Sequence, residues 1–125
     1  MKEAIRYLKN AKEILKTIPV ENNVYTDIKP VREAFGTAYL AVLEAINEYL
    51  LTHKGFKKKE LPKSVEAYRD ALRKHVAIRN GKLLREFENL YDALHIAGYY
   101  RGLIYDARAV KDYMNAAKEF IEKVK

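Results

Sequence analysis

The sequence predicts an all-α protein, an up-and-down antiparallel bundle of four long helices plus one short helix. Apolar residues recur at steps of three and four through most of the chain, and no stretch alternates as a strand would. The segments between these periodic stretches are short, which makes successive helices antiparallel neighbours. The chain has 125 residues, the size of a single domain, and we expect residues 1–125 to form one.

Residues 31–51 are predicted to form the central helix, because they are the longest and most apolar helical stretch. Asp27 and Pro30 give a start signal for it, since proline is tolerated in a first helical turn. Small residues at positions 34, 36 and 41 allow other helices to approach from more than one direction. The apolar stripe itself consists of Val31, Phe35, Ala38, Val42, Ala45 and Tyr49.

The first helix is predicted over residues 2–18, with an apolar stripe on one face and a basic opposite face. Pro19 and the polar residues 21–23 end it. After the central helix, the connection 55–63 is rich in lysine and is expected to be an exposed loop. Ser64 is a candidate N-cap for a shorter helix over residues 65–78, and Asn80 with Gly81 predicts a break after it.

The fourth helix begins near Leu83 and is predicted to stop near Gly98. Residues 98–102 begin and end with glycine, so we interpret them as the connection to the last helix. Asp106 is the candidate cap of that helix. Its apolar stripe is Val110, Tyr113, Ala117, Phe120 and Val124.

Composition narrows the classes of function. The formal net charge is +7, and the chain contains no cysteine, which removes disulfides, thiolate catalysis and cysteine-based zinc sites. No apolar stretch approaches the roughly 20 residues that cross a bilayer, and the first residues lack the apolar core of a secretory signal. We therefore expect a cytoplasmic protein that does not enter a membrane and needs no cofactor or metal ion.

Three stretches carry a resemblance to a known family: residues 63–68 (KSVEAY), 82–84 (KLL) and 94–102 (LHIAGYYRG). They resemble a bacterial family of small helical domains of unknown function, and the similarity extends over nearly the full chain. The resemblance implies a helical bundle of the HEPN kind, in which paired protomers are common. It brings no catalytic residues with it.

HEPN ribonucleases use an arginine, a polar residue and, a few residues later, a histidine for RNA cleavage without a metal at a dimer interface. Arg69, Asp70 and His75 fit that pattern. Six residues along a helix turn by about 240°, however, which places Arg69 and His75 on different faces. The alternative is a packed or interface histidine, so Arg69 and His75 are only alternative catalytic residues.

The fourth helix and the segment after it supply the candidate binding residues. His95 lies one turn beyond Tyr91 on the inward side of the helix, where it could do acid-base chemistry or simply be hydrogen-bonded and partly buried. Tyr99, Tyr100 and Arg101 suit a recognition surface, or else only close the end of the bundle.

Lys57, Lys58 and Lys59 are candidate phosphate contacts for RNA, or else a solvated loop that keeps the protein soluble. No arginine-rich helical face accompanies them. The sequence favours a non-enzymatic interaction module that associates with itself, as a homodimer, or with another protein. The alternative is an RNA-binding or metal-independent RNA-cleaving protein of the HEPN kind.

Overall fold

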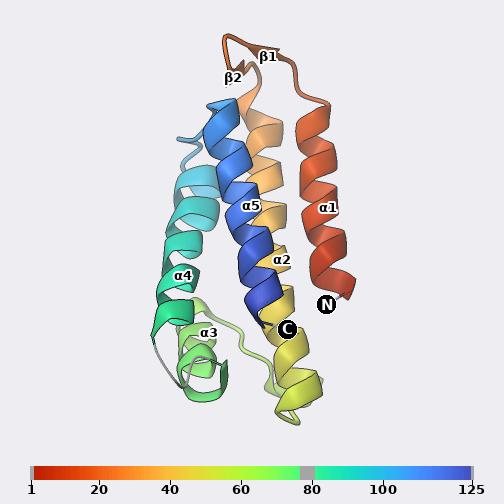
Figure 1. Cartoon of the computed structure of the whole chain (residues 1–125), viewed down its shortest axis with the longest axis vertical. Coiled ribbons are helices and arrows are strands. Elements are labelled where there is room, and N and C mark those ends of the chain that lie inside the picture. Colours follow the sequence, from red (N-terminus) through yellow and green to blue (C-terminus); the bar gives the residue numbers. More distant parts are fainter. Residues whose placement is uncertain (1, 77–80, 125) are drawn as a thin grey trace.

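The computed structural model describes residues 2–76 and 81–124, and it confirms the all-α antiparallel bundle (Figure 1). The long helices are α1 (Lys2–Lys16), α2 (Ile28–His53), α4 (Lys82–Leu90) and α5 (Ala107–Val124). A π-helix, η3 (Tyr91–Tyr100), continues α4 to the upper end of the bundle in Figure 1. The short α3 (Val65–Ala71) continues into a π-helical turn, η2 (Leu72–Val76), and the 3-10 turn η1 (Lys58–Glu60) precedes it.

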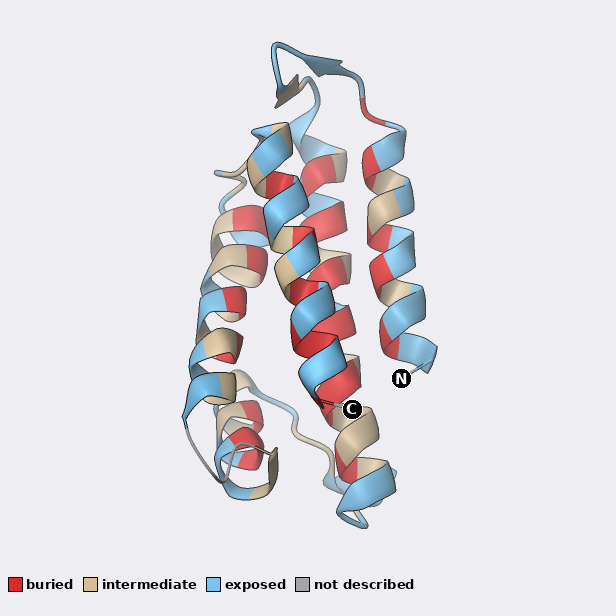
Figure 2. Ribbon diagram, in the orientation of Figure 1, coloured by how far each residue is buried: buried red, intermediate tan, exposed pale blue. Residues whose placement is uncertain are grey.

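Helix α2 is the central element, as predicted. It contacts α1, η3 and α5, and its buried residues run from Val31 to Leu50. Asp27 is its N-cap, and the Asp27 side chain accepts a hydrogen bond from the backbone N of Lys29 at 3.2 Å. Figure 2 shows the buried residues of the surrounding helices turned toward this core. The largest fully buried side chains include Phe35, Phe87 and Phe120.

The expectation that no strand occurs is wrong for the segment between α1 and α2. Strands β1 (Val20–Glu21) and β2 (Val24–Tyr25) form a short antiparallel hairpin, in which Val20 pairs with Tyr25. Asn22 and Asn23 have φ values of 52° and 64°, the left-handed conformation that a two-residue hairpin turn requires. Two-residue strands are too short to show a period of two, so the hydrophobic pattern carries no sign of them.

This hairpin binds the connection between η3 and α5. The backbone N of Tyr25 donates to the carbonyl of Tyr105 at 3.0 Å, and the backbone N of Ala107 donates to the carbonyl of Asn23 at 2.8 Å. The Asn23 side chain also donates to Oδ1 of Asp106 at 2.7 Å. The connection is therefore fixed to the hairpin.

The predicted stop near Gly98 is also wrong, since η3 continues to Tyr100. Gly98 is buried inside the helix against α2, and the residue with a turn conformation is Gly102, with φ of 61°. Arg32 closes the end of η3: its Nε donates to the carbonyl of Tyr99 at 2.7 Å and its Nη2 to that of Tyr100 at 2.6 Å. Carbonyl groups left free at a helix end need such partners.

The other predicted caps are confirmed. Ser64 Oγ accepts a hydrogen bond from the backbone N of Ala67 at 3.1 Å, and Oδ2 of Asp106 accepts one from the backbone N of Ala109 at 2.8 Å. The predicted break at Asn80, with the end of the predicted third helix, lies outside the described residues. No helix within the described residues is long and apolar enough to cross a membrane.

Candidate functional site

An aromatic cluster joins η3 to α2 and consists of Tyr39, Tyr91, His95 and Tyr99. The last three are spaced by four residues along η3, so their rings lie on one side of it. The His95 ring stacks on Tyr91, with centroids 5.5 Å apart, and on Tyr99, with centroids 5.9 Å apart. Tyr39 reaches in from α2, with its ring centroid 4.8 Å from that of His95.

Small residues allow this approach. A Cβ at Gly36 would lie 2.9 Å from Cδ1 of Tyr99, so the Tyr99 ring lies directly over the α2 backbone at that position. On the inner side of η3, the ring of Phe35 likewise lies where a side chain at Gly98 would begin. The absence of side chains at Gly36 and Gly98 thus brings η3 close to α2 and places Tyr99 beside His95.

Two grooves meet at this cluster and share Tyr39 and His95. The larger, of about 570 Å³, lies between α1, α2 and η3, with Gly36, Thr37 and Leu40 on the α2 side. The smaller, of about 290 Å³, extends toward Ser64 at the start of α3. The aromatic cluster therefore lies between the two grooves, and Leu40 and Tyr99 in the larger one are exposed.

Tyr39 of the cluster and the nearby Tyr68, which lines the smaller groove, are neutral at ordinary pH. Burial raises the pKa of Tyr39 to about 12, with further contributions from nearby Tyr91 and Tyr68, while Arg69 acts in the opposite direction. Burial also raises the pKa of Tyr68, whose hydroxyl donates to Oδ1 of Asn47 at 2.8 Å. At neutral pH both phenols are hydrogen-bond donors, which suits recognition of a polar group more than proton abstraction.

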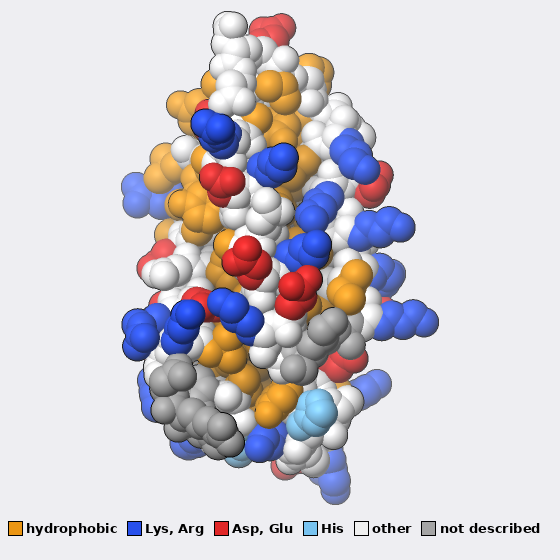
Figure 3. All heavy atoms as spheres, in the orientation of Figure 1, with side chains coloured by type: hydrophobic (Ala, Val, Ile, Leu, Met, Phe, Trp, Pro, Cys, Tyr) orange, Lys and Arg blue, Asp and Glu red, His pale blue; other side chains and the backbone are white. Residues whose placement is uncertain are grey.

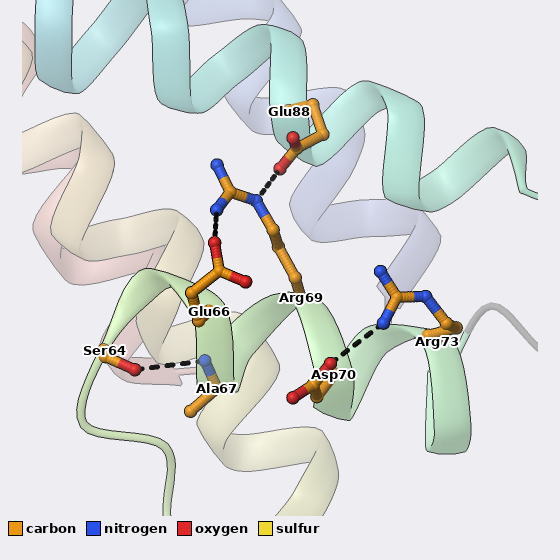
Figure 4. A network of polar contacts seen from close by, with 7 residues as sticks. All are labelled: Ser64, Glu66, Ala67, Arg69, Asp70, Arg73 and Glu88. Carbon is orange, nitrogen blue, oxygen red and sulfur yellow. Dashed lines mark hydrogen bonds and ion pairs between the residues drawn. The ribbon is translucent and has the colours of Figure 1, made fainter.

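Arg69 lies beside this surface and is engaged by acidic partners (Figure 4). Its Nε donates to Glu88 at 2.5 Å, a second nitrogen pairs with Glu66, and the guanidinium lies 5.4 Å from the centre of the Tyr91 ring. The hydrogen bond to Glu88 is the main cause that raises the pKa of Arg69. The side chain therefore ties α3 to α4.

His75 has different surroundings. Its ring meets Phe56 edge-on, with centroids 5.2 Å apart, in the part of the molecule next to the lysine-rich loop. Among the described residues, no hydrogen bond, ion pair or shared contact joins His75 to Arg69. The structure does not bring these two residues together within one chain.

The predicted binding residues separate into two places. Tyr91, His95 and Tyr99 form the cluster, and Tyr100 and Arg101 follow them at the end of η3, both exposed. Lys57, Lys58 and Lys59 are exposed at the opposite end of the bundle, beyond the last turn of α2 (Figure 1). Lys57, Lys58 and Lys59 therefore do not form one site with the aromatic cluster, although Lys63, at the end of the same connection, lines the smaller groove.

The sequence pattern did not predict that Gly36, Thr37 and Leu40 of α2 line the larger groove. A signal was present, because Leu40 is a large apolar residue outside the main stripe of its helix. Among the described residues, no three His, Asp or Glu side chains gather as a candidate metal site.

Comparison with known proteins gives the family but no activity. A protein of unknown function from Dyadobacter fermentans has a similar solved structure, with a TM-score of 0.77 and 35% sequence identity, covering 98% of this chain and 89% of that one. No curated protein matches the sequence. The family model described as a domain of unknown function, DUF5618, matches residues 1–125. The chain belongs to the DUF5618 family.

Proposed function

We propose that this protein is a non-enzymatic interaction module that forms a homodimer through the surface around the aromatic cluster. The observation that carries the proposal is a group of large apolar residues exposed on α2, η3 and the connection after η3. We call this group the apolar face. Its members are Ile28, Leu40, Tyr99, Tyr100, Leu103 and Tyr105.

The members of the apolar face are held close to one another. Leu40 and Tyr99 line the same groove. Arg32 binds the carbonyls of Tyr99 and Tyr100, and a Cβ at Gly102 would lie 3.0 Å from the Arg32 side chain. The connection that carries Leu103 and Tyr105 therefore runs along the first turns of α2, where Ile28 lies.

The exposed area supports a dimer. At roughly 200 Å² for a fully exposed large side chain, the fractional exposures of the six residues amount to on the order of 600 Å². A standard interface takes about 800 Å² from each partner, of which a little over half is apolar. The apolar face is thus large enough for one half of a symmetric interface, in which each copy presents the same surface.

A second copy is the proposed occupant because paired protomers are also what the HEPN resemblance implies. The tyrosines suit such an interface, since each presents a large rigid area with a hydroxyl that stays at the rim. We further propose that the protein works in the cytoplasm.

Light scattering coupled to gel filtration, at tens of micromolar protein, tests the proposal. The wild-type protein should have twice the mass of one chain, and Leu40→Glu should shift it to the monomer, because the carboxylate would be buried in the interface. Ile5→Glu is the matched control: Ile5 is 52% exposed and Leu40 47%, but Ile5 lies on α1, outside the apolar face. A monomeric wild type, or equal dissociation of both variants, would contradict the proposed dimer.

A further inference from the structure

A separate groove, between α1 and α5, combines an apolar floor with a basic rim. It has a volume of about 340 Å³. Leu8 and Ile121, which are 5% and 2% exposed, form the floor, and the half-exposed Ile5 forms one edge. We call it the α1–α5 groove, and it is separate from the aromatic cluster, with which it shares no lining residue.

The α1–α5 groove has a direction. Helices α1 and α5 run antiparallel, and the two chain ends lie at the same end of the bundle (Figure 1). Ile5 and Ile121 therefore lie toward one end of the groove, and Lys12 and Lys118 toward the other. Ile5 and Lys12 are separated by about 10 Å along α1, at 1.5 Å per residue. Lys12 and Lys118 therefore place positive charge toward one end of the groove, whereas Ile5, Ile121 and the acidic Glu122 lie toward the other.

The cations at this groove are available to a ligand. Within the described residues, salt bridges hold Arg6 to Glu3 and Lys16 to Glu13, but none holds Lys9, Lys12 or Lys118. Glu122 is the acidic residue of the lining, so three ammonium groups face one carboxylate. Figure 3 shows basic side chains gathered over α1 and the neighbouring side of α5. The excess positive charge favours an anion.

We propose that the α1–α5 groove binds a free single-chain anionic amphiphile, such as a medium-chain fatty carboxylate. The hydrocarbon chain lies over Leu8 and Ile121 and ends at Ile5, and the carboxylate is bound by the ammonium groups of Lys9, Lys12 and Lys118. The apolar stems of these lysines cover the first methylenes of the ligand. The volume of the groove is in the range of small-molecule sites in proteins.

The charge and the shape of the groove together select this class of ligand. A neutral alcohol of the same length would fill the floor but leave the three ammonium groups without a partner. A short anion would meet the lysines but gain nothing from the floor. The floor is recessed between two helices, so it suits one chain inserted lengthwise more than the flat surface of a bilayer.

Isothermal titration calorimetry with octanoate, decanoate and dodecanoate, each below its micelle concentration, tests the proposal. The affinity should rise about fourfold for each added methylene until the groove is full, the value for burying one CH₂. Decanol should bind about tenfold more weakly than decanoate, as expected for the loss of several exposed ion pairs.

Variants locate the site. Replacing Lys9, Lys12 and Lys118 together by glutamine should weaken decanoate binding about tenfold, and Ile5→Asn should weaken it as well. The matched control replaces Lys57, Lys58 and Lys59 by glutamine, which removes the same charge at the far loop and should leave binding unchanged. All of these positions are at the surface, and circular dichroism melting checks that each variant is folded.

The proposal is wrong if wild-type protein binds none of the carboxylates, or if the control weakens binding as much as the groove variant. It is also wrong if the protein binds anionic phospholipid vesicles but no monomeric carboxylate, because that result would mean attraction to a membrane surface. Binding that follows chain length and the groove lysines supports it.

Discussion

The ring of Phe35 occupies the space where a side chain at position 98 would begin. A Cβ built on Gly98 would lie 2.6 Å from Cδ1 and 2.7 Å from Cδ2 of Phe35, well inside van der Waals contact. Both residues are buried, with Phe35 in the first half of α2 and Gly98 near the end of η3. This contact sets the distance between the two helices that carry the aromatic cluster.

Gly98→Ala should therefore destabilise the protein by about 1–3 kcal/mol, the usual cost of overpacking a core. The sign is informative, because replacing glycine by alanine inside a helix ordinarily stabilises by about 1 kcal/mol. Urea denaturation followed by circular dichroism measures the change. Adding Phe35→Leu should recover part of the loss by making room for the methyl group, and strictly additive effects would show that the two side chains do not compete.

Phe35→Ala tests the central position of α2. Phe35 is fully buried, and its ring meets Tyr113 of α5 edge-on at 6.3 Å. Removing a buried phenylalanine leaves a cavity, and we expect a loss of about 3–5 kcal/mol in the free energy of unfolding. The exposed Lys111→Ala should change it by less than about 0.5 kcal/mol. Equal shifts in the two variants would show that α2 is not the core helix.

Alkaline pH should destabilise the fold through Tyr39. Its folded pKa is raised to about 12, above the unfolded value near 10, so the unfolded chain releases the phenol proton first. Stability from this group is complete below pH 10 and is lost as pH rises through 12. Tyr39→Phe should flatten the fall in stability between these values, whereas Tyr105→Phe, at an exposed site, should not. Identical profiles for wild type and Tyr39→Phe would contradict the effect of burial.

His75→Ala distinguishes the two proposed functions, an interaction module and a metal-independent ribonuclease. The His75 ring contacts Phe56, so we expect a loss of about 1 kcal/mol in stability and no loss of activity, since purified protein should not cleave single-stranded RNA in the presence of a chelator. Cleavage that persists with the chelator and disappears in His75→Ala would establish the alternative. Arg69 would then have to leave Glu66 and Glu88 and meet a histidine of a second chain.

Replacing Lys57, Lys58 and Lys59 by alanine should leave RNA retention unchanged in a filter-binding assay at physiological salt. We expect this because the three side chains lie on an exposed loop away from the aromatic cluster. A phosphate-binding loop would instead lose affinity in the variant and show a weaker dependence on salt, since fewer counterions would be released.

The starts of three helices could be predicted from N-cap residues in the sequence. Asp27, Ser64 and Asp106 each cap the helix that was expected to follow, because a short polar side chain satisfies backbone N–H groups within three residues of itself. The end of η3 was not predictable in this way. Glycine is a common residue at a helix end, but Gly98 lies inside η3 because the ring of Phe35 packs against it. Phe35 is 63 positions earlier in the chain, and no local pattern reveals this contact.

The candidate site was predictable along one helix and not across helices. The four-residue spacing of Tyr91, His95 and Tyr99 indicates a shared face, and the structure stacks their rings. The contact of Tyr39 with His95 could not be predicted, because the apolar stripe of α2 does not specify which helix covers which part of it. The two grooves at the cluster are lined by residues of several helices, so they could not be predicted without knowing which helices are neighbours.

The hydrogen bond between the side chains of Asn23 and Asp106 joins two segments that are far apart in the sequence, which bears on the order in which the helices assemble. Asn23 belongs to a turn between neighbouring helices, which can form early because α1, the hairpin and α2 are close in sequence. Closing the loop from Asn23 to Asp106 carries a larger entropic cost. We therefore expect the hairpin and the packing of α1 on α2 to form before α5 docks onto them.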